Sequence, residues 1–258
     1  MVLLSFDIEE FDMPLEYKGE ITFEEQILIS QNGLKKILDI LKKHEIKATF
    51  FSTVIFAKRS TFLINRLLDE GHELASHTWY HSRYENKHLK ESREELGKLF
   101  STKIIGIRIP RMRAVDNREV FKAGYSYNSS VNPTWLPGRY NNLQVPRTYF
   151  KDKNVLQIPA SVSPFFRIPL FWLSFHNFPL WIYKILAMLT LKNDKYLNLY
   201  FHPWEFSNIK NKSYNLPSFT TVNTGDAMVR RLDNFISWVK EKNYTFVTFQ
   251  QFQERIGL

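Results

Sequence analysis

Three of the chain's seven histidines lie in the segment GHELASHTWYH, residues 71–81. His77 and His81 are four positions apart. This spacing brings two side chains to one face of a helical turn or compact loop, where their ring nitrogens can bind one metal ion. His72 and His77 are five positions apart, so the segment does not match the H-E-x-x-H motif of zinc peptidases. Because an H-x-x-x-H pair also arises by chance, the metal interpretation requires a further ligand.

The further ligand is expected in the acidic stretch SFDIEEFD, residues 5–12. Side chains alternate along a strand, so Asp7 and Glu9 point to one face and the intervening isoleucine to the other. One carboxylate can then bind a metal ion while the other acts as a base. A solvated acidic loop is the alternative interpretation, and it suits Glu10 and Asp12 better than Asp7, which directly follows an apolar run.

Short apolar runs alternate with helical patterns along the chain. Leucine and isoleucine repeat at helical spacing through residues 32–44, and a second helix is expected to end at Gly71. Further helices are expected at about 86–100, 117–124 and 225–242, and strands at 2–9, 47–53, 72–78, 104–110, 125–130, 155–161 and 196–204. About seven βα units of this kind predict a mainly parallel sheet closed into a barrel or distorted barrel.

The composition limits the partners and the possible ligands. A chain of 258 residues with 44% hydrophobic residues is expected to form one domain, residues 1–258. It has no cysteine, so metal ligands must be His, Asp or Glu. The net charge of +9 favours acidic partners but is spread along the chain, which argues against nucleic-acid binding. The start VLLSFDIEE lacks the pattern of a signal peptide, which predicts a cytoplasmic protein.

Four motifs in order, SFDIE, GHELASHTWYH, RIP and YFHP, resemble those of the polysaccharide deacetylases, the NodB-homology carbohydrate esterases of a family 4-like type. The resemblance runs from about residue 3 to about residue 250. It implies a distorted (β/α) barrel of the NodB-homology type. It also implies one divalent metal ion, zinc or one of its neighbours cobalt, iron, nickel and manganese, held by one carboxylate and two histidines.

The resemblance also implies a role for individual residues. Asp7 corresponds to the catalytic base, and His77 and His81 to metal ligands. Arg108 corresponds to the arginine that orients the base, and His202 to the general acid. The alternatives are a structural salt bridge for Arg108 and a structural role for His202.

The chain departs from the family pattern in places that concern the metal and the substrate. Ile8 stands where most members have a second aspartate, so the metal carboxylate is expected to be Glu9. Arg111 replaces a usual aromatic residue in RIPRMR, and Asn128 stands where an aspartate is common. These two residues and Trp204 are expected to contact the substrate. The stretch YFHPWEF resembles the branch that takes part in bacterial surface-polysaccharide assembly.

The implied activity is metal-dependent N-deacetylation of an amino sugar in a bacterial glycan or a lipid-linked saccharide. In this mechanism the metal activates a water molecule, Asp7 takes its proton, and His202 protonates the leaving amine. Two alternatives stay open: an allantoinase-like hydrolase of cyclic amides, and an inactive carbohydrate-binding relative.

The segment SPFFRIPLFWLSFHNFPLWIYKILAMLTLK, residues 163–192, is the most apolar and aromatic part of the chain. Its prolines interrupt any single membrane span, but its Trp, Tyr, Lys and Arg residues suit a membrane–water boundary. We therefore predict peripheral contact of residues 163–192 with the anionic inner face of a membrane, through Phe171, Trp172 and Trp181. The alternative is a core segment with a helix at about 179–191.

Overall fold

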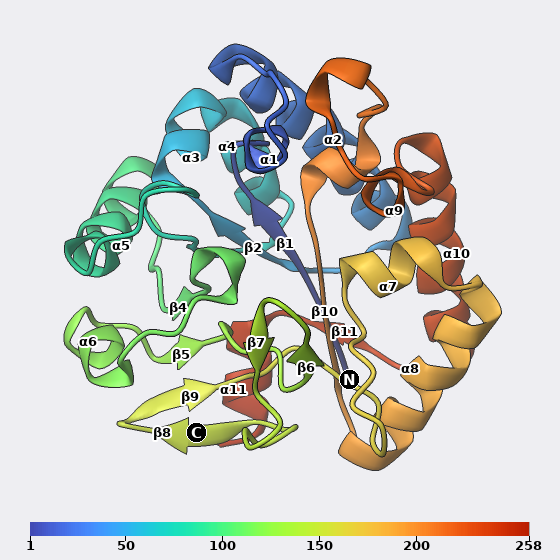
Figure 1. Ribbon diagram of the computed structural model, residues 1–258. Helices are drawn as coiled ribbons and strands as arrows, with labels where there is room; N and C mark the ends of the chain where they lie inside the picture. The colour runs from blue at the N-terminus through green and yellow to red at the C-terminus, as the bar shows by residue number, and fades with distance from the viewer. Residues whose placement is uncertain (258) are drawn as a thin grey trace.

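A computed structural model describes residues 1–257 of the chain and shows a curled sheet surrounded by helices (Figure 1). The strands are β1 (Val2–Ile8), β2 (Thr49–Ser52), β3 (Glu73–Ser76), β4 (Gly106–Ile107), β5 (Tyr127–Asn128), β6 (Trp135–Leu136), β7 (Tyr140–Asn141), β8 (Phe150–Asp152), β9 (Val155–Gln157), β10 (Leu197–Phe201) and β11 (Phe246–Val247). The helices are α1 (Met13–Glu16), α2 (Phe23–His44), α3 (Val54–Arg59), α4 (Thr61–Asp69), α5 (Lys87–Phe100), α6 (Asn117–Lys122), α7 (Trp172–Asn177), α8 (Leu180–Asp194), α9 (Ser218–Thr221), α10 (Asp226–Glu241) and α11 (Phe249–Arg255). Short 3₁₀ turns are η1 (Pro110–Met112), η2 (Pro203–Phe206) and η3 (Lys212–Tyr214).

The main sheet has the strand order β10-β1-β2-β3-β4-β5-β9-β8, with β11 paired to the start of β1. All pairs are parallel except the β8–β9 hairpin. The chain after β9 reaches the edge strand β10, where Ser161 donates its backbone N–H to Asn198 and the Asn198 amide donates to the Pro159 carbonyl. The sheet thus curls toward closure, and the predicted distorted barrel is confirmed.

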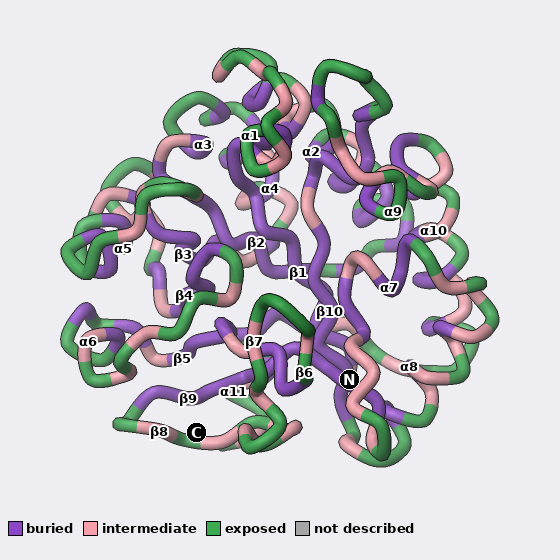
Figure 2. The backbone as a smooth tube through the Cα atoms, in the orientation of Figure 1, coloured by how far each residue is buried: buried purple, intermediate pink, exposed green. Residues whose placement is uncertain are grey.

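All seven predicted strands are present, and their burial explains why their apolar runs were recognisable. Every residue of β1 is buried (Figure 2), and helices cover the outside of the sheet (Figure 1). Where a helix would follow β5, the chain forms the antiparallel pair β6–β7 instead.

Helix α2 begins at Phe23, nine residues before the predicted segment 32–44. Thr22 and Glu25 form a capping box that satisfies free backbone N–H groups at its start. Gly33 lies on the inner face of this helix, and a Cβ there would come within 1.7 Å of the Pro203 carbonyl oxygen. Because glycine permits this close approach, α2 packs directly on η2 and fixes the chain immediately after His202.

Residues 163–192 form a short hairpin followed by α7 and α8, so the helix predicted at about 179–191 is present. Within residues 1–257, none of the helices combines the length and the apolar character needed to cross a bilayer. The aromatic side chains of this segment divide between interior and surface. Phe171 is buried, Trp172 is half-buried and Trp181 is exposed.

Candidate active site

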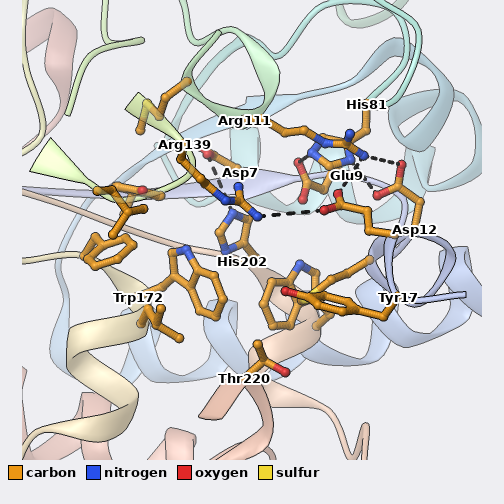
Figure 3. Close-up of a pocket in the computed structure, with 18 of the residues that line it drawn as sticks. Asp7, Glu9, Asp12, Tyr17, His81, Arg111, Arg139, Trp172, His202 and Thr220 are labelled. Atoms are coloured by element: carbon orange, nitrogen blue, oxygen red, sulfur yellow. Dashed lines mark hydrogen bonds and ion pairs between the residues drawn. The ribbon is translucent and has the colours of Figure 1, made fainter. Parts of the chain in front are cut away.

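A cavity of about 310 Å³ lies at the carboxyl ends of the strands, the end at which βα barrels place their chemistry. Asp7 is on β1 and Glu9 directly follows that strand. His77 follows β3, and His202 follows β10. Figure 3 shows Asp7, Glu9 and His202 around one space. Residues far apart in the sequence therefore meet at a single pocket.

Glu9, His77 and His81 bring three ligand atoms together within 4.8 Å of one another. Glu9 Oε2 lies 3.0 Å from His77 Nε2 and 3.3 Å from His81 Nε2. Glu9 Oε2 is buried and makes no hydrogen bond within the described chain. A buried carboxylate oxygen of this kind needs a partner, and one carboxylate with two imidazoles suits a divalent ion with open coordination positions. The three residues therefore fit the metal ion that the motifs imply.

Asp12 holds one of these histidines from behind. Its Oδ1 lies 2.7 Å from His81 Nδ1, and Ser82 donates a hydrogen bond to its other oxygen. A carboxylate in this position orients the ring so that Nε2 faces the metal position. The solvated acidic loop suggested for Glu10 and Asp12 is wrong. Both side chains are buried, and Glu10 accepts a 2.6 Å hydrogen bond from Thr53.

Asp7 and Arg108 form a buried ion pair with 2.6 Å between Oδ1 and Nη1. Arg108 is fully buried, and its remaining donors bind Ser5 Oγ and the carbonyl and hydroxyl of Ser129. Burial raises the pKa of Asp7, but the Arg108 charge and hydrogen bond, with the nearby histidines His77 and His202, hold it below its ordinary value. Asp7 is therefore kept ionised, and within residues 1–257 its side chain is hydrogen-bonded through Oδ1 alone.

His202 lies across the pocket from this pair, with its Nε2 4.0 Å from Asp7 Oδ2. Its Nδ1 lies 2.8 Å from Glu205 Oε1, and its ring stacks on Trp204 with 4.9 Å between ring centres. Burial lowers the pKa of His202, but the hydrogen bond to Glu205 and the charges of Glu9, Glu205 and Asp7 raise it above the ordinary value. The ring can thus carry a proton beside the pocket.

The three predicted substrate residues lie in different places. Arg111 lines the pocket, where its guanidinium pairs with Glu16 at 2.7 Å. Trp204 also lines the pocket but is buried beneath His202. Asn128 is buried beside a neighbouring cavity of about 530 Å³, with its side-chain amide donating to Asn117. Contact of each residue with substrate stays a prediction.

Two residues of the site were missed in the sequence. Asp12 stands at the end of an acidic run, where an exposed loop is the simpler interpretation. Glu205 lies three positions after His202. This spacing lets a side chain return to the preceding histidine across one turn, and it is the only sequence signal that we find for Glu205.

Residues 17–110, which contain His77, His81 and Arg108, match a family described as Polysaccharide deacetylase. Over these residues the chain is similar in sequence to the NodB-homology polysaccharide deacetylases. The chain is 35% identical over 94 residues to the peptidoglycan-N-acetylmuramic acid deacetylase PdaA of Bacillus subtilis strain 168, and the match covers 34% of this chain and 35% of PdaA. Its match to an uncharacterized 30.6 kDa protein of Geobacillus stearothermophilus, 40% identical over 70 residues, covers 25% of this chain and 26% of that protein. The matches thus span about a quarter to a third of these two relatives' length.

Solved structures support the deacetylase fold. A probable polysaccharide deacetylase from Pseudomonas aeruginosa PAO1 superposes with a TM-score of 0.66 at 14% identity, covering 93% of this chain and 84% of that one. PuuE allantoinase superposes with a TM-score of 0.60 at 17% identity, also covering 93% and 84%. At these identities the likeness concerns the fold alone.

Proposed function

We propose that residues 1–258 form a single domain that removes an acyl group from the nitrogen of an amino sugar, with a divalent metal ion, zinc or a neighbour, held by Glu9, His77 and His81. One observation carries this proposal: the three candidate ligands share a pocket with His202 and with Asp7, whose carboxylate is paired to the buried Arg108. An ion bound there would supply Lewis-acid activation of an amide carbonyl and of water. The relationship to PdaA, whose name states an N-acetylated amino sugar, supports this choice of substrate.

The protein's own groups would divide the proton transfers. Asp7 is held by Arg108 through Oδ1, which leaves Oδ2 directed toward the pocket to accept a proton from the attacking water. The water oxygen first forms a C–O bond to the carbonyl carbon, and the C–N bond then breaks, giving a carboxylic acid and a free amine. His202 Nε2 faces the same space and would donate the proton that the departing nitrogen needs.

Acetate release separates this function from its alternatives. Purified, zinc-loaded protein should release acetate from N-acetylated saccharides, offered both free and as lipid-linked forms, and should not open the ring of a cyclic ureide. Ring opening without acetate release would favour the allantoinase-like alternative. If the protein catalysed neither acetate release nor ring opening, a carbohydrate-binding relative would be favoured. The complete set of Asp7, Arg108 and His202 argues against that outcome.

The rate of the reaction should fall at alkaline pH as His202 loses its proton. The pKa of His202 is raised above its ordinary value of about 6.5, so the protonated acid should persist beyond neutral pH and decline above the raised pKa. Replacing His202 by Gln should lower kcat by about 10²–10⁴-fold and remove this alkaline limb. Measurement of kcat/KM against pH tests both points, and an unchanged limb in the variant would contradict the assignment.

We further propose that residues 163–192 contact an anionic membrane that carries a lipid-linked saccharide substrate. The tip of the hairpin closed by Val162 and Pro169 presents Phe165 and Phe166, which are 85% and 84% exposed. On α8, three apolar side chains spaced four apart are also exposed: Trp181, Ile185 and Leu189. Lysines at 192 and 195 are exposed at the end of this helix and would complement anionic lipid.

The residues proposed to contact the membrane differ from those predicted from the sequence. Phe171 is buried, which contradicts its assignment to the membrane surface, and Trp172 lines the pocket. Phe165 and Phe166 take their place. Only Trp181 keeps the exposed position that the sequence interpretation required.

Changing both Phe165 and Phe166 to Glu should lower partitioning onto phosphatidylglycerol vesicles at least about tenfold. Each phenylalanine side chain that moves from water into the lipid contributes about 1.5–3 kcal/mol to binding. Added salt should weaken the binding of the unchanged protein. Phe121→Glu, at a half-exposed phenylalanine on α6, is the matched control and should bind normally. Co-sedimentation measures the binding of the double variant, of the wild type at increasing salt and of the control. If the wild-type protein did not bind these vesicles at low salt, the membrane proposal would be excluded.

A further inference from the structure

Three side chains, His202, Glu205 and His176, are joined by hydrogen bonds that lead from the pocket into the protein interior. Glu205 Oε1 lies 2.8 Å from His202 Nδ1, and Glu205 Oε2 lies 2.7 Å from His176 Nε2. Glu205 and His176 are both fully buried. His176 belongs to α7 and Glu205 to η2, so the cluster exists only when these two segments pack together.

The same tryptophan packs against both histidines of this cluster. The Trp172 ring meets His176 and His202 edge-on, with ring centres 5.6 Å apart in each case and interplanar angles of 87° and 86°. One face of His202 is covered by the stacked Trp204 ring. Both imidazoles are thus held in fixed orientations around Glu205.

The contacts of Glu205 distinguish this arrangement from ordinary core packing. A buried carboxylate is stable in its ionised form only when its oxygens accept hydrogen bonds. His202 supplies its backbone N–H and Nδ1 to Oε1, and His176 is the side chain that serves Oε2. Burial raises the pKa of Glu205, but the two histidines hold it below its ordinary value. Without His176, one oxygen of this buried carboxylate would lose its donor.

We propose that His176 is a positioning residue for His202: its Nε2–H keeps Glu205 ionised and oriented, and Glu205 fixes the Nδ1–H tautomer of His202, which leaves Nε2 free to face the pocket. The ring nitrogen that carries the proton is set by the hydrogen bond at the other nitrogen. The consequence for turnover rests on the proposed role of His202 as the general acid.

Other charged and titratable groups also face His202, and they define what a His176 variant would change. Asp7 and Glu9 approach from β1 and its end, Glu205 from η2, and the Tyr200 ring lies 5.9 Å away on β10. His176→Leu would leave these groups in place and remove only the donor to Glu205. Without this donor Glu205 would be ionised to a smaller extent. The pKa of His202 would then fall, and the alkaline limb of the rate profile would move to lower pH.

His176→Leu should therefore lower kcat by about 10–100-fold, the effect typical of a supporting residue behind a reacting group, with KM and zinc content unchanged. His176→Gln places an amide N–H near the position of Nε2 and should restore most of the rate and the pH profile. His88→Leu is the matched control, since His88 is buried on α5 outside the pocket. It should lower thermal stability without moving the profile.

Nitrogen-15 NMR of labelled histidines tests the arrangement without any turnover, in both metal-free and zinc-loaded protein. Neutral His202 should carry its proton on Nδ1 in the wild type, and His176→Leu should change its ring signals whereas His88→Leu should not. A wild-type His202 protonated on Nε2 would overturn the proposal even if His176→Leu cannot fold. An unchanged pH profile and unchanged His202 signals in a folded His176→Leu protein would also overturn it. If no substrate is found, the proposed function fails, but the NMR result still tests the role of His176, because the tautomer of His202 is observed without turnover.

Discussion

Replacing Asp7 by Asn is expected to lower kcat by about 10²–10⁴-fold while the protein keeps its bound metal. The amide has nearly the shape of the carboxylate, so the pocket should retain its geometry. It has no basic oxygen of comparable strength, however, and cannot take the proton of the attacking water. Acetate release measured together with zinc content per chain tests the prediction.

Asp7→Asn also leaves the buried Arg108 without its counter-charge, so some loss of stability is expected and must be separated from the loss of rate. Thermal unfolding of the variant measures this loss. Asp233→Asn is a suitable control, because Asp233 pairs with Lys43 and His44 far from the pocket. A near-normal rate for Asp7→Asn would rule out Asp7 as the base.

Replacing His77 by Ala is expected to abolish stoichiometric zinc binding and reduce acetate release to background. His77 would supply one of three protein ligands, and its Nε2 lies 3.0 Å from the Glu9 oxygen that would share the ion. Its Nδ1 makes no hydrogen bond within residues 1–257, so the fold should lose little besides ring packing. Metal analysis after dialysis, with circular dichroism to confirm folding, measures both effects.

His88→Ala provides the comparison for His77→Ala, since it also truncates a buried histidine but one outside the pocket. It should retain one zinc ion and normal activity. Full zinc occupancy in His77→Ala would mean that other side chains bind the ion.

The parts of the site that the sequence predicts are those with local patterns. Asp7 and Glu9 could be placed on one face because strand alternation is local, and His77 and His81 because four residues separate them. The order of the motifs then placed Arg108 and His202 with them. The strands themselves were recognisable because buried parallel strands appear as apolar runs.

The parts that could not be predicted depend on contacts between distant segments. His176 meets Glu205 only because α7 packs beside η2, and no spacing in the sequence records that contact. The burial of Asp12 is set by His81 and Ser82, which lie about 70 positions away. Similarly, the inward position of Phe171 and the outward position of Phe165 follow from a hairpin whose two sides are similarly rich in apolar residues in the sequence.

Zinc titration of metal-free protein, with acetate release from an N-acetylated saccharide as the readout, measures whether deacetylation depends on one bound metal ion. The rate should rise in proportion to added zinc up to one ion per chain and then stay constant, with no response in His77→Ala. Deacetylation at full rate in thoroughly metal-free protein would contradict the metal-dependent mechanism, as would an equal response to zinc in His77→Ala.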